Sequence, residues 1–140
     1  MKVETNSARQ PGRRLKLLIA DDSAALCDRL VNMFSELEGV EVIGLAQDVP
    51  SAHAAIRTLS PDVVILDIQM PGGSGIDVLR AVKEKRSSTI AIMLTNHPYL
   101  QYRQKCLELG ADYFFSKSTD AQRLREVIEE LTESQGYIHE

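Results

Sequence analysis

Residues 63–77, which read VVILDIQMPGGSGID, decide the fold of this chain. Val63 to Leu66 form an apolar, mostly β-branched run without polar alternation, typical of a strand buried on both faces of a parallel sheet. Asp67 ends the run and is expected at the strand's carboxyl end, because burying an ionised carboxylate within the strand costs several kcal/mol. The segment after Met70, with Gly72, Gly73 and Gly75, predicts a wide loop whose backbone can approach a ligand closely.

Other polar residues follow apolar runs in the same way as Asp67. They are Asp21 and Asp22 after residues 15–20, Thr95 after residues 90–94, and Lys117 after residues 113–115. A parallel sheet gathers the carboxyl ends of its strands at one edge, which is where ligands bind in open α/β sheets. We therefore expect these side chains and Asp67 to share one edge.

Strand-like and helical segments alternate five times from Leu15 onward, which predicts one α/β domain with a doubly wound, five-stranded parallel sheet and five helices. The domain is expected over residues 15–134, between a flexible basic tail at 1–14 and a C-terminal tail at 135–140. Helix starts are predicted at Ser23, at Pro50 or Ser51, at Ser74, at residues 96–98, and at Thr119, which stands at capping-box spacing from Gln122.

Composition excludes several classes of protein. The chain carries a net charge of −4, and its basic residues are concentrated at the N-terminus, so the acidic body argues against direct nucleic-acid binding. No apolar run reaches the roughly 20 residues needed to cross a bilayer, so no membrane association is expected. Cys27 and Cys106 fall within helical apolar patterns and are interpreted as core residues of a cytoplasmic protein.

The acidic pair Asp21 and Asp22, followed by Asp67, Thr95 and Lys117, resembles the receiver domain of two-component response regulators. The resemblance covers roughly residues 15 to 134 and implies the flavodoxin-like receiver fold, with strand order 2-1-3-4-5. It also implies a receiver in a phosphorelay, phosphorylated by a sensor histidine kinase or a histidine phosphotransfer protein. Because no second domain or long linker follows the receiver in the sequence, a stand-alone receiver is expected. Such a protein catalyses only its own phosphorylation and dephosphorylation. It would signal to a downstream protein through the surface of its last two helices and final strand, or form a phosphorylation-dependent homodimer.

Three clustered carboxylates raise one another's proton affinity unless a cation neutralises them, and Mg²⁺ prefers such oxygen ligands. The resemblance assigns Asp22 and Asp67 as direct ligands, with the Gln69 backbone carbonyl as a third and Asp21 acting through water. Asp67 is then the nucleophile that forms an aspartyl phosphate, and Lys117 neutralises the phosphoryl oxygens.

Further roles follow from the resemblance. Thr95 would hydrogen-bond the phosphoryl group, and Phe114, three residues before Lys117, matches the switch aromatic, although a core phenylalanine would look the same. Gln69 and His97 match positions that flank the path of the hydrolytic water, and Asn96 is expected to crowd that path.

Two positions depart from the family pattern: Ser118 stands where proline is usual, often with a cis bond, and Asn96 stands where alanine or glycine is usual. Three alternatives remain. The first is a haloacid-dehalogenase-like phosphotransferase or phosphatase, which acts on external substrates through an aspartyl phosphate. Such enzymes need a second aspartate two residues after the nucleophile, where this chain has Gln69. A receiver-like binding module would work without phosphorylation, and a receiver excised from a longer transcriptional regulator would have the same sequence features.

Overall fold

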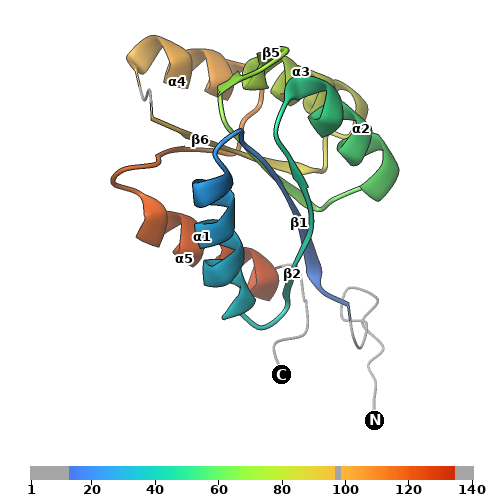
Figure 1. Ribbon diagram of the computed structural model, residues 1–140, viewed down its shortest axis with the longest axis vertical. Coiled ribbons are helices and arrows are strands. Elements are labelled where there is room, and N and C mark those ends of the chain that lie inside the picture. The colour runs from blue at the N-terminus through green and yellow to red at the C-terminus, as the bar shows by residue number, and fades with distance from the viewer. Residues whose placement is uncertain (1–12, 97–98, 135–140) are drawn as a thin grey trace.

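A five-stranded parallel sheet forms the centre of the protein (Figure 1). The computed structural model describes residues 13–96 and 99–134. The order of the strands is β2-β1-β3-β6-β7. Since β4 and β5 form a separate small hairpin, β6 and β7 are the fourth and fifth strands of the main sheet, and the predicted order 2-1-3-4-5 is confirmed. The strands of the main sheet are β1 (Leu15–Ala20), β2 (Val40–Ala46), β3 (Val63–Leu66), β6 (Ile90–Thr95) and β7 (Tyr113–Ser116).

Five helices cover the two faces of the sheet (Figure 1). They are α1 (Ala24–Ser35), α2 (Val49–Leu59), α3 (Gly75–Lys85), α4 (Leu100–Glu108) and α5 (Ala121–Ser134). One apolar cluster joins α1 and α5 to one face of the sheet, and a second joins α2, α3 and α4 to the other face. In the described part of the chain, no helix is both long and apolar enough to cross a membrane.

Two predicted helix caps are confirmed. The Ser23 hydroxyl accepts a hydrogen bond from the Leu26 amide at the start of α1, and the Ser74 hydroxyl accepts one from the Ile76 amide at the start of α3. These bonds satisfy amide groups that a helix N-terminus leaves unpaired. Helix α1 begins directly after Asp21 and Asp22, and α3 begins after the β4–β5 hairpin that follows Asp67, so both caps hold segments next to these aspartates.

The starts of the other three helices differ from prediction. Asp48 caps α2 through a reciprocal capping box with Ser51, so this helix begins slightly earlier than expected. Helix α4 begins at Leu100 rather than at residues 96–98, of which 97 and 98 lie outside the described residues. The capping box predicted between Thr119 and Gln122 is wrong, because α5 begins at Ala121 and the Gln122 amide group donates to Glu126 within the helix.

The segment after Asp67 is a tight hairpin rather than the wide loop that its glycines suggested. Strand β4 (Gln69–Met70) pairs antiparallel with β5 (Gly73–Ser74), and Gly72 adopts a φ of 86° in the turn. Gly75 packs so closely that a Cβ atom there would overlap the carbonyl oxygen of Asp67. The close approach predicted for this segment is therefore made to the chain's own backbone, which holds the hairpin against Asp67.

Candidate functional site

Three carboxylates meet at the carboxyl ends of β1 and β3, as the sequence predicted. One carboxylate oxygen from each of Asp21, Asp22 and Asp67 lies within 4.8 Å of the others. Asp21 and Asp67 are buried, with 2% and 6% of their surface exposed, whereas Asp22 is exposed to solvent. The cluster is thus anchored in the fold on one side and open to water on the other.

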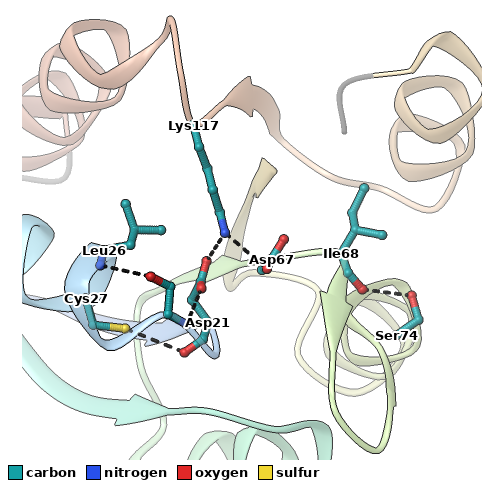
Figure 2. A network of polar contacts seen from close by, with 8 residues as sticks. Asp21, Leu26, Cys27, Asp67, Ile68, Ser74 and Lys117 are labelled. Atoms are coloured by element: carbon teal, nitrogen blue, oxygen red, sulfur yellow. Dashed lines mark hydrogen bonds and ion pairs between the residues drawn. The ribbon is translucent and has the colours of Figure 1, made fainter. Parts of the chain in front are cut away.

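Lys117, at the end of β7, reaches into this cluster (Figure 2). Its Nζ atom lies 2.6 Å from Asp21 Oδ2 and 3.1 Å from Asp67 Oδ2. One ammonium group facing three carboxylates leaves a surplus of negative charge, so the donor set fits a further hard cation. Mg²⁺ suits the set because it binds carboxylate oxygens and keeps several waters, which the exposed Asp22 side of the cluster admits.

Burial and neighbouring charges explain the pKa shifts of Asp67 and Lys117. Burial raises the pKa of Asp67, and the negative charge of Asp21 adds to this effect, against opposing contributions from Lys117 and the Gln69 backbone amide. Burial alone would lower the pKa of Lys117, but the hydrogen bond to Asp21 and the attraction of Asp67 raise it above its usual value. Lys117 is therefore a cation at neutral pH.

The start of α1 orients Asp21 (Figure 2). Asp21 Oδ1 accepts a 2.8 Å hydrogen bond from the Ser23 amide, while the Asp21 carbonyl oxygen lies 3.6 Å from Cys27 Sγ. Cys27 is 1% exposed and Cys106 is fully buried, which confirms their interpretation as core residues. Burial, followed by the charge of Asp21, raises the pKa of Cys27. No pattern in the sequence predicted the contact between Cys27 and Asp21.

Ser74 fixes the hairpin on the other side of Asp67 (Figure 2). Its hydroxyl donates to the Ile68 carbonyl over 3.3 Å while it accepts from the Ile76 amide. The Gly75 amide donates to the same Ile68 carbonyl over 2.7 Å. Asp67 is therefore followed directly by a segment with three local hydrogen bonds, which restricts the position of its backbone.

The two residues predicted to act as a switch lie on β6 and β7. Thr95 is fully buried, and its carbonyl oxygen accepts a 2.9 Å hydrogen bond from the Lys117 amide. Phe114 is 6% exposed, so in this structure the ring already points inward. The Arg103 guanidinium lies 5.9 Å from the centre of the Phe114 ring, and its Nη1 atom donates to the Phe114 carbonyl over 3.4 Å. The sequence did not predict this contact between α4 and β7.

Two of the three predicted dephosphorylation residues, Gln69 and Asn96, are exposed to solvent. Gln69 is exposed on β4 and lines, together with Asp22 and Tyr102, an open hollow of about 400 Å³. Asn96 is exposed just after β6, and His97 lies outside the described residues. The bond between Lys117 and Ser118 is trans, because the described residues contain no cis peptide bond.

The comparisons with known proteins agree with this arrangement. The response regulator receiver domain family matches residues 17–129. A CheY-like receiver domain protein from Methanospirillum hungatei, of known crystal structure, superposes with a TM-score of 0.78 and 27% identity, over 87% of this chain and 96% of that one. The fold and the acidic edge of the sheet thus define a receiver, and the chain belongs to the response regulator receiver family.

Two curated relatives are longer than this chain. It is 37% identical over 121 residues to a protein-glutamate methylesterase/protein-glutamine glutaminase of Anaeromyxobacter dehalogenans, covering 86% of the chain and 34% of the relative. It is 34% identical over 125 residues to a putative transcriptional regulator of Pseudomonas aeruginosa, covering 89% of the chain and 58% of the relative. The similarity to these proteins therefore concerns only part of each.

Proposed function

We propose that the chain accepts a phosphoryl group on Asp67 from a sensor histidine kinase or a histidine phosphotransfer protein. The observation that carries the proposal is the convergence of Asp21, Asp67 and Lys117, in which one ammonium contacts two buried carboxylates at 2.6 and 3.1 Å. Mg²⁺ would be held by Asp22, Asp67 and the Gln69 carbonyl, with Asp21 acting through water. When bound, it supplies positive charge next to the incoming phosphoryl group.

The residues of the chain have distinct parts in the transfer. A carboxylate oxygen of Asp67 forms the new bond to phosphorus while the bond from phosphorus to the donor breaks, and the donor group leaves with its electron pair. Lys117 neutralises the phosphoryl oxygens, and the Thr95 hydroxyl donates a hydrogen bond to one of them. Because phosphoryl transfer depends mainly on positioning and charge neutralisation, these groups together with bound Mg²⁺ would support self-phosphorylation.

Hydrolysis of the phosphoryl group would involve the residues at the open side of the site. Gln69 orients the attacking water, as its exposed position beside Asp22 allows. Asn96 crowds the approach of that water, and His97 makes the decay depend on pH between about 6 and 8, near the usual pKa of histidine. The chain would thereby catalyse its own dephosphorylation.

The output surface would consist of α4, β7 and α5. Three large apolar side chains of the α4 segment are exposed, Tyr99 at 55%, Leu100 at 65% and Leu107 at 43%, which suits a protein partner or a phosphorylation-dependent homodimer. We propose that residues 15–134 form the receiver, between tails at 1–14 and 135–140. We further propose that it acts as a stand-alone cytoplasmic receiver without direct nucleic-acid binding.

A small phosphodonor tests the phosphoacceptor directly. Incubation with acetyl phosphate and Mg²⁺ should add the mass of one phosphoryl group, and a chelator should prevent it. The Asp67→Asn variant should show no addition, whereas Asp77→Asn, which changes an exposed aspartate on α3, should react like the parent protein. Full mass addition in Asp67→Asn would refute the assignment, and no addition in the parent would favour a binding module that works without phosphorylation.

The size of the protein in its native cells tests the stand-alone proposal. An antibody raised against this chain should detect a band of its 15.6 kDa mass. A band of the size of the longer relatives would show instead that the receiver is part of a larger regulator, as in the alternative reading. Neither result changes the assignment of Asp67.

A further inference from the structure

A second hollow lies between α2 and α3, on the face of the sheet opposite α1 and α5. Its volume is about 280 Å³. Ile56, Ala81 and Val82 provide an apolar floor, and His53, Arg57, Lys85 and Arg86 complete the lining. These residues belong to the middle and C-terminal parts of the two helices. Since Asp67 lies near the N-terminus of α3, this α2–α3 groove is separate from the phosphoacceptor site.

The cations around the groove lack acidic partners within the part of the chain that is described. Four other cations on the helices have acidic partners: Arg80 with Asp77, Lys83 with Asp112, Arg123 with Glu126, and Arg125 with Glu36. No hydrogen bond or ion pair to a described residue involves the side chains of Arg57, Lys85 or Arg86. Among the described residues, no carboxylate lines the groove.

Local helix stability accounts for only part of this arrangement. Arg57 and Lys85 lie in the last turns of α2 and α3, where a positive charge offsets the helix dipole. That effect needs neither a shared hollow nor an apolar floor beneath the charges. Three unpaired cations around an apolar floor are a strongly localised positive feature on a chain of net charge −4.

The chemistry of the lining selects the kind of ligand. Guanidinium and ammonium groups favour carboxylates, and the floor of Ile56, Ala81 and Val82 favours an apolar side chain. Pockets for small molecules typically measure about 300–1,000 Å³, and the groove, at about 280 Å³, lies just below that range. Its lining contains no phenylalanine, tyrosine or tryptophan on which a nucleobase would stack. We propose that the α2–α3 groove binds an acidic peptide segment of a partner protein, with one apolar side chain on the floor and flanking Asp or Glu residues against Arg57, Lys85 and Arg86.

Selection from a random peptide library displayed on phage tests the proposal with the intact chain. The parent protein should enrich peptides in which aliphatic or aromatic residues are flanked by acidic residues. A variant with Arg57→Glu and Lys85→Glu should lose this enrichment, because it reverses two cations that are both exposed. The matched control reverses Arg14 and Arg29, which are also exposed but lie just before β1 and on α1, outside both the groove and the proposed output surface. It receives the same change of net charge and should select the same peptides as the parent.

Binding and mapping then complete the test. The best peptide, synthesised and labelled, should bind the parent at least tenfold more tightly than the groove variant and should shift the amide signals of Ala81 and Val82. The proposal would be overturned if the parent enriched no acidic peptides or if the groove variant selected the same peptides as the parent. It would also be overturned if the control variant lost the enrichment as fully as the groove variant. Tighter binding of a single-stranded oligonucleotide to the same groove would also overturn it. Phosphorylation of Asp67, measured in parallel, stays intact in the groove variant, so failure here is distinct from failure of the phosphoacceptor assignment.

Discussion

Helices α1 and α4 follow strands β1 and β6, which end at the edge of the sheet that carries the acidic cluster, yet the two helices are attached to the protein very differently. Helix α1 begins with the Ser23 cap and buries Leu26, Cys27, Leu30 and Phe34. Helix α4 has no side-chain cap and buries only Cys106. The charged cluster thus stands beside a firmly packed helix on one side and a loosely packed helix on the other.

This difference separates two tasks. Groups that position a reacting phosphoryl group need elements with fixed geometry, and Asp21 receives this from β1 and α1. A surface that reports phosphorylation needs an element that can rearrange at low cost, and such elements have few buried contacts. Helix α4 meets that condition, and its contact through Arg103 to Phe114 connects it to β7.

The largest expected effect contrasts a buried leucine of α1 with an exposed leucine of α4. Leu30→Ala on α1 removes a side chain that is 4% exposed and should lower the free energy of unfolding by about 2–5 kcal/mol. Leu100→Ala on α4 removes one that is 65% exposed and should change it by no more than about 0.5 kcal/mol. Urea denaturation measures both values. Equal losses would mean that α4 is as firmly packed as α1.

Alkaline pH should lower the stability of the protein through Cys106, the single buried residue of α4. Burial raises the pKa of Cys106 from 9.0 to about 11. Between these pH values the unfolded chain loses the thiol proton and the folded protein keeps it. The free energy of unfolding is therefore unaffected by this thiol below pH 9 and falls as the pH rises toward 11, by up to about 2–3 kcal/mol. Urea denaturation at pH 8 and pH 10.5 measures the loss. Cys106→Ala should be less stable at pH 8 and should decline less; an identical decline would assign the effect to other groups.

The surplus of negative charge at the acidic cluster, next to the firmly packed α1, predicts a smaller change in the free energy of unfolding. Asp67→Asn removes one of three carboxylates that face one ammonium, so in a chelator it should stabilise the fold by roughly 0.5–2 kcal/mol. Mg²⁺ should stabilise the parent protein and have little effect on the variant. Thermal unfolding with and without Mg²⁺ tests both statements. A variant that is less stable in chelator would show that the contact between Asp67 and Lys117 outweighs the repulsion.

The smallest effects concern how long the phosphoryl group persists. Gln69→Ala should lengthen its half-life several-fold, because the amide no longer orients water, and Asn96→Ala should shorten it by a similar factor as the approach opens. These are changes of about 1 kcal/mol or less in the barrier. Loss of phosphate from protein labelled with acetyl phosphate measures the decay. A Gln69→Ala decay as fast as that of the parent would remove this side chain from the mechanism.

The sequence predicted the parts of the fold that depend on apolar pattern. Runs such as Val63–Leu66 predicted the strands, and the residues after them correctly placed Asp21, Asp67 and Lys117 at one edge. Serine caps at Ser23 and Ser74 were predictable because their hydrogen bonds are local. The same reasoning failed at Thr119, where two residues at the right spacing do not determine where a helix begins.

Contacts between distant segments could not be predicted. Nothing in the sequence indicates that Gly75 must lack a side chain because the carbonyl of Asp67 fills its space. The cation–π contact of Arg103 with Phe114 and the convergence of Arg57 with Lys85 and Arg86 depend on how helices pack in three dimensions. Such features become visible only when the relative positions of the elements are known.

Amide spectra recorded before and after phosphorylation test the central claim, that a firmly held site drives a loosely held α4. With acetyl phosphate and Mg²⁺, signals in residues 99–116 should shift, while those in the second half of α1 should stay in place. Asp67→Asn under the same conditions should show neither change. Unchanged signals throughout α4 and β7 in fully phosphorylated protein would contradict the account.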